Sequence, residues 1–455
     1  MNSFSGKTVL VCGAARSGLA SARLLKRLGA RVTVQDLKDE ASLADEVKIL
    51  NEMDVPCIFG RNPHEKEAPA YDLLVLSPGV PSDLPFVEEA RKLGKPVWGE
   101  IELAYVCCRA PVIAITGTNG KTTTTALVGA IVKKKYPGAE TVGNIGVPFA
   151  DKVCGLTETD YAVAEISSFQ LETAVTFKPY IAAILNITPD HLNRHKTFEN
   201  YAAVKEHIFK NQGPEEFAVL NFDDPFCVKA AGRISSRVVF FSGSQVLREG
   251  VYRQGDGLYV AMPGSDPEKI IDTGELQIFG RHNIENALAA IACGLCAGVP
   301  SDLARDALRE FTGVEHRIEF VMELNGIKYY NDSKATNTDA AIKSVQAIEQ
   351  PIILIAGGSD KGADFGGWVK TFQGRVKRII VLGEVADKII DTCKAYNFYA
   401  FDRVKSMKDA VALAYREAER GDCVLLSPAC ASFDMFDNYE QRGRIFKQLV
   451  AELGE

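Results

Sequence analysis

The chain has 455 residues, a length that suggests about three domains of roughly 150 residues each. Its 52 basic and 59 acidic residues give a net charge of −7, which argues against nucleic acid or an anionic membrane as the main partner. No apolar run reaches the ~20 residues of a membrane helix, and no signal peptide precedes the first strand. Of the 11 scattered cysteines, Cys293 and Cys296 have no second pair at zinc-site spacing, so we expect a cytoplasmic protein with free thiols and no membrane insertion.

The first hundred residues alternate predicted strands and helices. "KTVLVCG" and "RVTVQD" are short apolar strands around the amphipathic helix "SGLASARLLKRLG", and "YDLLVLSPGV" is a further strand. This order predicts a parallel, doubly wound sheet. Between the first strand and helix, "GAARSG" resembles a dinucleotide fingerprint, and Asp36 stands where a ribose-binding acid would be, but the middle glycine is Ala15. The pattern is compatible with a bound nucleotide of some kind, and it favours NAD less than another nucleotide.

A second unit starts near Gly99 with the apolar strand "VIAIT", the turn "GTNG" and the helix "KTTTTALVGAIV". Backbone N–H groups and a helix N-terminus converge in such a connection, which favours a bound anion. Lys121 would add a positive charge for phosphates, and the Thr122 hydroxyl could bind Mg²⁺. The usual phosphate loop has a glycine where Ile115 stands, so this is a variant with shortened spacing. The alternative is a plain connection with a surface lysine.

Polar residues follow the next two predicted strands, "YAVAEIS" and "IAAILNIT". Glu165 ends the first and is placed to hold Mg²⁺ directly or through water, unless it is only a rim carboxylate. His191 follows Asp190 after the strand "IAAILNIT". Whether His191 contacts a metal or a nucleotide is left open by the sequence. Lys205 lies within "ENYAAVKEHIF" and is predicted to be a solvated helix lysine. The long helix "HNIENALAAIACGLCAG" then packs on this unit.

A third unit begins near Phe311 and contains three polar loops, each at the end of a predicted strand. These loops are "YYNDSKATNTDA", with Asp332, Ser333, Lys334, Thr336 and Asn337, "GGSDKGADF", with Lys361, and "LLSPACASFDMFDNYEQRG", with Ser427 and Ser432. Ligands of open parallel sheets sit at the carboxyl ends of the strands. The three loops are therefore expected to form one site, and their lysines and hydroxyls suit a carboxylate-bearing ligand.

With these motifs gathered, the whole chain resembles the Mur ligase family of ATP-dependent amide-bond-forming enzymes. "GTNGKTT", "EISSFQLE", "NITPDHLNRH", "HNIENALAA", "NDSKATN" and "LLSPACASFDMFDNYEQRG" occur in the family's order. The resemblance implies three α/β domains: a Rossmann-like domain for the UDP substrate at 1–99, a P-loop ATPase-type parallel sheet for ATP at 100–312 and a Rossmann-like D-glutamate domain at 313–455. It implies addition of D-glutamate to UDP-N-acetylmuramoyl-L-alanine through an acyl phosphate, in cytoplasmic peptidoglycan precursor synthesis.

The same resemblance implies the ligand contacts. The UDP-linked substrate is expected at Ser17, Asp36, Lys38, Ser77, Gly79, Asn144 and Ser167. ATP is expected at Gly117, Thr118, Asn119, Gly120, Lys121, Thr122, Thr123, Asn283, Asn286, Arg317 and Asp332. D-glutamate is expected at Lys334, Thr336, Lys361, Ser432, Phe433 and Tyr439. The acid directly before Lys361 is Asp360, whereas some relatives place the acid elsewhere, and this difference concerns the acceptor pocket.

The catalytic centre implied by the resemblance holds two Mg²⁺ ions. Thr122, Glu165, His191 and a Lys205 carbamylated by CO₂ would surround them, and Lys121 would act on the phosphates. This role for Lys205 is opposite to the prediction from its helix alone. The partners are then small molecules, with no nucleic acid, and the enzyme is expected to act as a monomer.

Three other functions are weighed against this one. A folylpolyglutamate synthetase would share the phosphate loop and a glutamate acceptor, but it would not need the N-terminal nucleotide-like domain with Asp36. An NAD-dependent oxidoreductase would use "GAARSG" and would leave the Lys121 loop unexplained. A nucleotide-binding regulator without turnover would keep the loop but release no phosphate.

Overall fold

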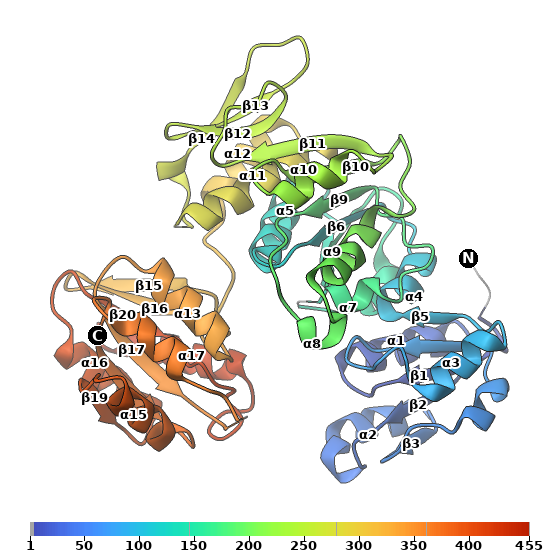
Figure 1. Ribbon diagram of the computed structural model, residues 1–455, viewed down its shortest axis with the longest axis horizontal. Coiled ribbons are helices and arrows are strands. Elements are labelled where there is room, and N and C mark those ends of the chain that lie inside the picture. Colours follow the sequence, from blue (N-terminus) through green and yellow to red (C-terminus); the bar gives the residue numbers. More distant parts are fainter. Residues whose placement is uncertain (1–3, 145, 279, 361, 455) are drawn as a thin grey trace. The chain divides into compact units, whose positions relative to one another are not determined.

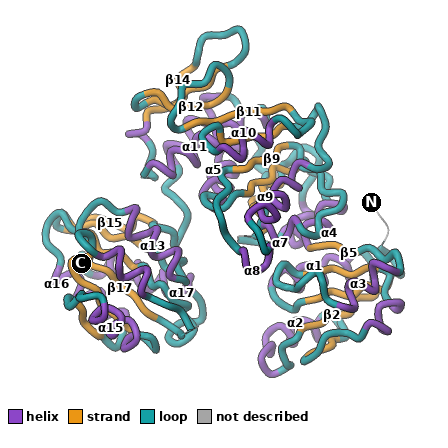
Figure 2. Tube along the Cα trace, viewed as in Figure 1, coloured by secondary structure: helices purple, strands orange, loops and turns teal. Residues whose placement is uncertain are grey.

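The computed structural model describes residues 4–144, 146–278, 280–360 and 362–454, in two compact units, Met1–Phe311 and Thr312–Glu455 (Figure 1). The described residues of unit 1 form a five-stranded and a nine-stranded sheet, and those of unit 2 form a six-stranded sheet. Helices pack against each sheet (Figure 2). These three α/β sheets confirm the predicted fold class. None of the helices in these ranges combines the length and apolar character that a bilayer span requires.

The first sheet is parallel throughout, with strand order β3-β2-β1-β4-β5. Its strands are β1 (Thr8–Cys12), β2 (Arg31–Asp36), β3 (Cys57–Phe59), β4 (Leu73–Leu76) and β5 (Val97–Gly99). Its helices are α1 (Arg16–Arg27), η1 (Ala41–Leu43), α2 (Ala44–Glu52), η2 (Glu65–Ala70) and α3 (Pro85–Lys92). β1 and β4 are nearly continuous apolar runs because both faces of a parallel sheet are covered.

The second sheet has strand order β14-β13-β12-β11-β10-β9-β6-β8-β7. Its strands are β6 (Val112–Thr116), β7 (Glu140–Gly143), β8 (Ala162–Glu165), β9 (Ile181–Ile184), β10 (Phe217–Asn221), β11 (Arg237–Ser242), β12 (Gly250–Gln254), β13 (Gly257–Ala261) and β14 (Glu268–Asp272). In sheet order from β7 to β12, which includes β6, neighbouring strands pair parallel. β13 pairs antiparallel with both β12 and β14. This antiparallel extension is not part of the predicted parallel sheet.

Helices cover both faces of the second sheet. They are α4 (Glu100–Cys107), α5 (Lys121–Lys135), α6 (Phe149–Lys152), η3 (Val153–Gly155), α7 (Ser168–Leu171), α8 (Leu192–His195), α9 (Phe198–Glu206), η4 (His207–Phe209), α10 (Pro225–Ala231), η5 (Thr273–Glu275), α11 (Arg281–Cys296) and α12 (Ser301–Glu310). Side chains of β6 alternate between two cores: Val112 and Ala114 join one, and Ile113 and Ile115 join the other. The carboxyl end of β6 is thereby held between two packed layers.

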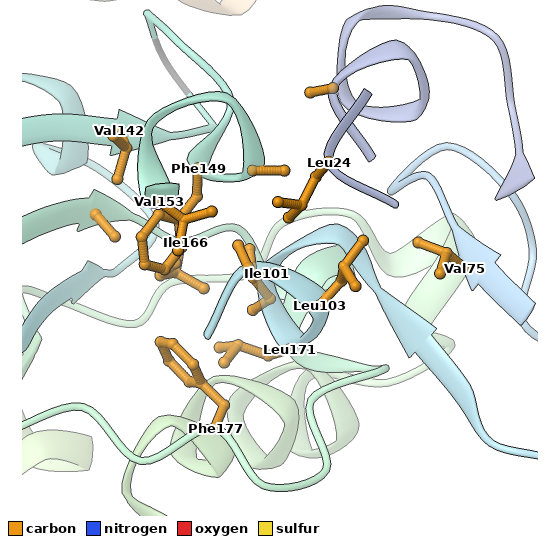
Figure 3. Packing of buried hydrophobic residues seen from close by; sticks show 14 of the residues in the cluster. Leu24, Val75, Ile101, Leu103, Val142, Phe149, Val153, Ile166, Leu171 and Phe177 are labelled. Carbon is orange, nitrogen blue, oxygen red and sulfur yellow. The ribbon is translucent and has the colours of Figure 1, made fainter. Parts of the chain in front are cut away.

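The two sheets of unit 1 share one hydrophobic core, which is centred on α4 (Figure 3). Ile101 and Leu103 of α4 are fully buried in this core. It also contains Leu24 and Val75 from the first sheet's layers, and Phe149 from the second. The first sheet with its helices is therefore packed directly against the second sheet.

Unit 2 has strand order β15-β16-β20-β17-β18-β19, parallel except for the β15–β16 pair. Its strands are β15 (Glu319–Leu324), β16 (Ile327–Asn331), β17 (Ile352–Gly357), β18 (Val376–Leu382), β19 (Phe401–Arg403) and β20 (Cys423–Leu426). Its helices are α13 (Thr338–Ala347), α14 (Gly366–Val369), η6 (Lys370–Phe372), α15 (Ala386–Ala395), α16 (Met407–Glu417) and α17 (Tyr439–Glu452). The carboxyl ends of β16, β20 and β17 lie side by side, so the loops that follow them meet.

Candidate active site

Two glycines with positive φ shape the loop between β6 and α5. Gly117 has φ +149° and Gly120 φ +84°, and a Cβ on Gly120 would lie 2.3 Å from Asn286 Oδ1. Gly120 is the N-cap of α5, so the helix N-terminus starts at the loop and favours an anion there. Lys121 Nζ donates to Gly117 O (2.9 Å) and to Thr118 O (2.8 Å), which holds its positive charge against the loop. The connection from β6 to α5 is thus a tight, glycine-dependent turn with a lysine charge held against it.

Neighbouring side chains fix the backbone of this loop. The Asn186 side chain accepts from Asn119 N (2.8 Å) and donates to Asn119 O (3.2 Å). The Thr118 hydroxyl lies 3.1 Å from Tyr201 Oη and donates to Thr188 O (3.1 Å). The loop is therefore preformed by contacts to the segments that follow β9.

Asparagines at the start of α11 lie beside the first turns of α5. Asn286 Oδ1 accepts from the Thr124 hydroxyl (3.2 Å), and Asn286 Nδ2 donates to Asn283 Oδ1 (3.1 Å). Thr123, on the same turn of α5, is buried. The structure thus gathers the expected ATP residues of unit 1 around one loop and one helix end.

Glu165 is the last residue of β8 and pairs in register with Ile115 of β6. Only 2% of it is exposed. Its Oε2 accepts from the Thr122 hydroxyl (2.9 Å), and its Oε1 accepts from Asn144 Nδ2 (2.8 Å). A buried carboxylate joined to the phosphate-loop threonine supplies oxygen ligands of the kind that Mg²⁺ prefers.

The prediction from its helix alone, that Lys205 is a solvated lysine, is wrong. Only 1% of the residue is exposed, and its Nζ donates to Gly117 O (2.8 Å) and to Thr116 Oγ1 (3.2 Å). Burial, assisted by the charge of Lys121, lowers the pKa of Lys205 to about 6. The amine lies directly beneath the phosphate loop and is largely neutral at neutral pH.

His191 lies at the start of α8 in the left-handed region (φ +52°) with a half-exposed side chain. Its Nε2 is 3.6 Å from Asp190 Oδ2, and its ring packs 4.9 Å from the ring of Phe169. In the described ranges no hydrogen bond or ion pair joins His191 to Glu165, and no group of three or more His, Cys, Asp or Glu side chains is suited to a metal.

Arg194 and Glu172 anchor the segment that carries His191. The Arg194 guanidinium makes two bonds to the Glu172 carboxylate (3.1 and 2.7 Å) and donates to Val80 O (3.3 Å) in the loop after β4. Nearby, Ser167 caps α7 by accepting from Gln170 N (3.3 Å). The loop after β4 is thus connected to the segment beside the phosphate loop.

The loops after β1, β2 and β4 meet at the carboxyl edge of the first sheet. Asp36 accepts from Ala14 N (2.8 Å) and from Lys38 N (2.9 Å), and the Ser77 hydroxyl donates to Gly13 O (3.3 Å). A Cβ on Gly13 would lie 2.7 Å from Ser77 Oγ, so the close approach requires glycine. Ser17 lies at the start of α1, and Gly79 is exposed in the loop after β4.

Two of the predicted residues of unit 2, Asp332 and Ser427, meet at the ends of β16 and β20. Asp332 is buried, accepts from the Ser427 hydroxyl (2.9 Å) and from Ile318 N (3.2 Å), and burial raises its pKa to about 6. Lys334 Nζ lies 5.9 Å from the centre of the Tyr439 ring.

The remaining predicted residues of unit 2 differ in exposure. Ser432 is buried, Thr336 is half-buried, Arg317 is exposed and Phe433 is 68% exposed. Asp360, directly before Lys361, accepts from Lys388 Nζ (3.2 Å). Lys361 lies outside the described residues.

Sequence reasoning missed Tyr201 and Arg442. Tyr201 bonds Thr118, and its ring centre lies 5.0 Å from Lys205 Nζ. Arg442 is buried among three loops of unit 2. The available signal was helical spacing: Tyr201 is four residues before Lys205, and Arg442 is three residues after Tyr439, so each pair shares a helix face.

Comparisons with known proteins agree along the chain. Residues 7–99 match the Mur ligase MurD-like N-terminal domain, residues 115–294 the Mur ligase middle domain, and residues 316–430 the Mur ligase glutamate ligase domain. The UDP-N-acetylmuramoylalanine–D-glutamate ligases of Alkaliphilus oremlandii and Thermoanaerobacter pseudethanolicus are each 48% identical to this chain. Both matches cover 98% of this chain, and they cover 98% and 99% of the two relatives, respectively.

A solved structure shares the fold at low sequence identity. The UDP-N-acetylmuramate–alanine ligase of Thermotoga maritima has a TM-score of 0.61 and 19% identity, over 98% of this chain and 99% of that one. Full-length identity of 48% is far above this level. The chain therefore belongs to the Mur ligase family, in the branch of the UDP-N-acetylmuramoylalanine–D-glutamate ligases.

Proposed function

We propose that this chain joins D-glutamate to UDP-N-acetylmuramoyl-L-alanine with ATP as the driving substrate, in the synthesis of peptidoglycan precursors. The observation that carries the proposal is a phosphate loop bonded to a buried acid, Thr122 to Glu165 at 2.9 Å, in a chain 48% identical to ligases of that name. ADP and phosphate are the other products. The phosphate held by the loop is transferred to a carboxylate.

ATP binds at the loop between β6 and α5 in this proposal. Backbone N–H groups from Gly117 to Thr123 surround its phosphates, with Lys121 as the positive charge beside them. Asn283 and Asn286, at the start of α11, lie next to α5 and are assigned to the adenine end. Arg317 and Asp332 are assigned to ATP from unit 2.

Two Mg²⁺ ions are proposed at Thr122, Glu165, His191 and a modified Lys205. The chemistry of Thr122 and Glu165 fits, because a hydroxyl and a buried carboxylate oxygen lie together at the phosphate loop. Mg²⁺ usually takes one or two carboxylates and completes its shell with substrate phosphates and water, so a group of three protein acids is not required. When bound, the ions would neutralise charge on the transferring phosphoryl group.

Lys205 is proposed to carry a carbamate. Its buried amine, with a pKa lowered to about 6, is the free base that CO₂ requires. The amine nitrogen forms a bond to the CO₂ carbon and loses one proton, which leaves an anionic carboxylate near the positive charge of Lys121. Nuclear magnetic resonance with ¹³C-bicarbonate should show a carbamate signal that Lys205→Met removes.

The other substrates are assigned to strand-end loops. We assign the UDP-linked substrate to Ser17, Asp36, Lys38, Ser77, Gly79, Asn144 and Ser167. We assign D-glutamate to Lys334, Thr336, Lys361, Ser432, Phe433 and Tyr439.

The proposed domains are residues 1–99, 100–312 and 313–455. The reaction is placed in the cytoplasm, where ATP and nucleotide-linked precursors are found, and the enzyme is expected to be a monomer by light scattering.

The reaction proceeds in two steps. An oxygen of the terminal L-alanine carboxylate attacks the γ-phosphorus of ATP, and the bond from that phosphorus to the β–γ bridging oxygen breaks, which gives an acyl phosphate and ADP. Lys121 holds positive charge against the phosphates during this transfer. The neutral amine of D-glutamate then attacks the acyl carbon, the C–O bond to phosphate breaks, and the nitrogen gives up a proton. His191 is assigned to orient this second step.

Phosphate release from MgATP and UDP-N-acetylmuramoyl-L-alanine tests the function. The assay compares D-glutamate with L-glutamate, L-lysine and no amino acid. Release that depends on D-glutamate is expected. Release with L-lysine instead would assign the protein to a sister ligase activity, and no release with any acceptor would favour a nucleotide-binding regulator.

A further inference from the structure

Arg442 is a buried arginine that no step of the proposed reaction uses. It lies in the first turns of α17, and 2% of it is exposed. Among the residues that the structure describes, no carboxylate forms an ion pair with it; Asp434 and Asp332 act on it only from a distance. Burial lowers its pKa to about 10, so it stays charged at neutral pH. A buried, unpaired cation needs a structural or functional reason.

Its guanidinium bonds only to loop oxygens. Nε donates to Ser333 Oγ (3.0 Å), and Nη2 donates to Ser333 O (2.9 Å) and Cys430 O (3.1 Å). Nη1 donates to Ala431 O (3.3 Å) and, at the long limit, to Gly357 O (3.5 Å). A guanidinium has five N–H groups, and these five bonds use all of them. Arg442 therefore has no donor left for a substrate.

The three acceptor loops follow three neighbouring strands. Ser333 lies after β16, Cys430 and Ala431 after β20, and Gly357 at the end of β17, in the sheet order β16-β20-β17. Two of the loops also bond each other, since Ser359 N donates to Ala431 O (3.0 Å). One side chain thus joins the three loops that the sequence groups into a single site.

The residues assigned to D-glutamate stand next to these acceptors. Ser432 directly follows Ala431, and Lys334 directly follows Ser333. The Ser333 hydroxyl also donates to Tyr439 O (2.8 Å), which ties the start of α17 to the same loop. A shift of the guanidinium would therefore change the spacing between the assigned contacts.

We propose that Arg442 is a positioning residue of the acceptor site, which holds the Ser432 loop and the Lys334 loop at the spacing that D-glutamate requires. This inference rests on the proposed function and adds a residue that does not touch the substrate. The unpaired positive charge also favours an anionic ligand at this edge of the sheet.

The test is steady-state kinetics of Arg442→Lys and Arg442→Met in the full-length enzyme. The KM for D-glutamate is expected to rise by at least about tenfold in both variants, and by at least as much in Arg442→Met as in Arg442→Lys. The reason is that small displacements of positioning groups weaken substrate binding and turnover strongly. The KM values for ATP and UDP-N-acetylmuramoyl-L-alanine are expected to stay within about threefold. Arg444→Met is the matched control, since Arg444 is exposed on the same helix and should match the wild type.

Folding is followed by thermal unfolding of each variant. If both Arg442 variants fail to fold, Ser333→Ala removes one acceptor and should raise the KM for D-glutamate by a smaller factor. A folded Arg442→Lys or Ser333→Ala enzyme with an unchanged KM for D-glutamate would overturn the inference, as would equal increases in all three KM values. A wild type without D-glutamate-dependent phosphate release would refute the proposed function itself.

Discussion

Lys121 holds its charge at the phosphate loop through bonds to two loop carbonyls. Lys121→Ala removes that charge without disturbing a packed core, because the side chain is only half-buried. D-glutamate-dependent phosphate release should fall by at least about 100-fold, the usual loss for a group that stabilises transition-state charge. Thermal unfolding should stay near the wild-type midpoint. Lys133→Ala, an exposed change on the same helix, is the control, and normal turnover by Lys121→Ala would rule out the loop as the ATP site.

Glu165 receives hydrogen bonds on both carboxylate oxygens, from Thr122 and Asn144. Glu165→Gln keeps the shape but removes the charge and one acceptor atom. We expect kcat to fall by at least about 100-fold and the Mg²⁺ concentration for half-maximal rate to rise, because the carboxylate is the proposed metal ligand. Magnesium titrations of phosphate release measure both. Glu140→Gln, on the half-exposed edge strand β7, should behave like the wild type; an unchanged Mg²⁺ requirement in Glu165→Gln would exclude Glu165 as a ligand.

Single residues are also where sequence reasoning is weakest. The place of Lys121 and Thr122 in the first turn of α5 could be predicted because the loop and the helix start are continuous in sequence. The burial of Lys205 was not, since its acceptors, Gly117 O and Thr116 Oγ1, lie almost 90 residues earlier in the chain. A helix pattern reports which face is apolar, but it does not report which polar atoms a distant loop presents to that face.

At the scale of elements, α4 carries two buried acids with different surroundings. Glu100 Oε1 accepts from Ala150 N (2.7 Å), whereas its Oε2 is buried with no hydrogen-bond partner in the described structure. Burial raises the pKa of Glu100 from 4.5 to about 7. Glu102 accepts from Val175 N (3.0 Å), Thr176 N (2.7 Å) and Phe177 N (3.0 Å), so its charge is well satisfied.

The raised pKa of Glu100 predicts how stability depends on pH. Between about pH 4.5 and 7 the folded state keeps a proton that the unfolded chain has lost, so this group makes the unfolding free energy fall as pH rises. Glu100→Gln cannot ionise and should be more stable than the wild type at pH 8, by up to about 3 kcal/mol, with the gain vanishing below about pH 5. Denaturant unfolding at several pH values measures the difference.

Glu102→Gln is the contrasting variant on the same helix. An amide offers one acceptor oxygen in place of two, so bonds to the 175–177 loop are lost and the protein should be destabilised by roughly 1–3 kcal/mol at neutral pH. A gain for Glu100→Gln that is the same at pH 5 and pH 8 would contradict the assigned pKa shift.

Element boundaries follow from the sequence where the pattern is local. The predicted strands "RVTVQD" and "VIAIT" coincide with β2 and β6, because apolar runs end there at polar or glycine residues. The antiparallel β12–β14 extension was missed, although Gly255 and Asp256 form a two-residue connection between β12 and β13 of the hairpin type. The period-2 pattern there is short, and the neighbouring α/β order suggested a parallel sheet.

At the scale of the whole molecule, the two units differ in how their sheets are supported. The two sheets of unit 1 share the core around α4. The loops after β4 and β9 are therefore held in fixed positions relative to each other, and contacts such as the bond from Arg194 to Val80 O join them directly. Unit 2 has separate cores on the two faces of its own sheet. The sequence could supply the number of sheets, but a shared core depends on which apolar faces meet in space.

This division predicts two unfolding transitions. Ile101→Ala opens a cavity in the core that joins the two sheets of unit 1, where Ile101 is fully buried (Figure 3). Such a truncation lowers the unfolding free energy by roughly 2–5 kcal/mol. In differential scanning calorimetry, the transition temperature of unit 1 should therefore fall by several degrees, and that of unit 2 should stay unchanged. Ile353→Ala, equally buried in unit 2, should do the reverse. If both variants lower one common transition, the two units unfold together; if Ile101→Ala splits the first transition, the sheets of unit 1 do not depend on a shared core.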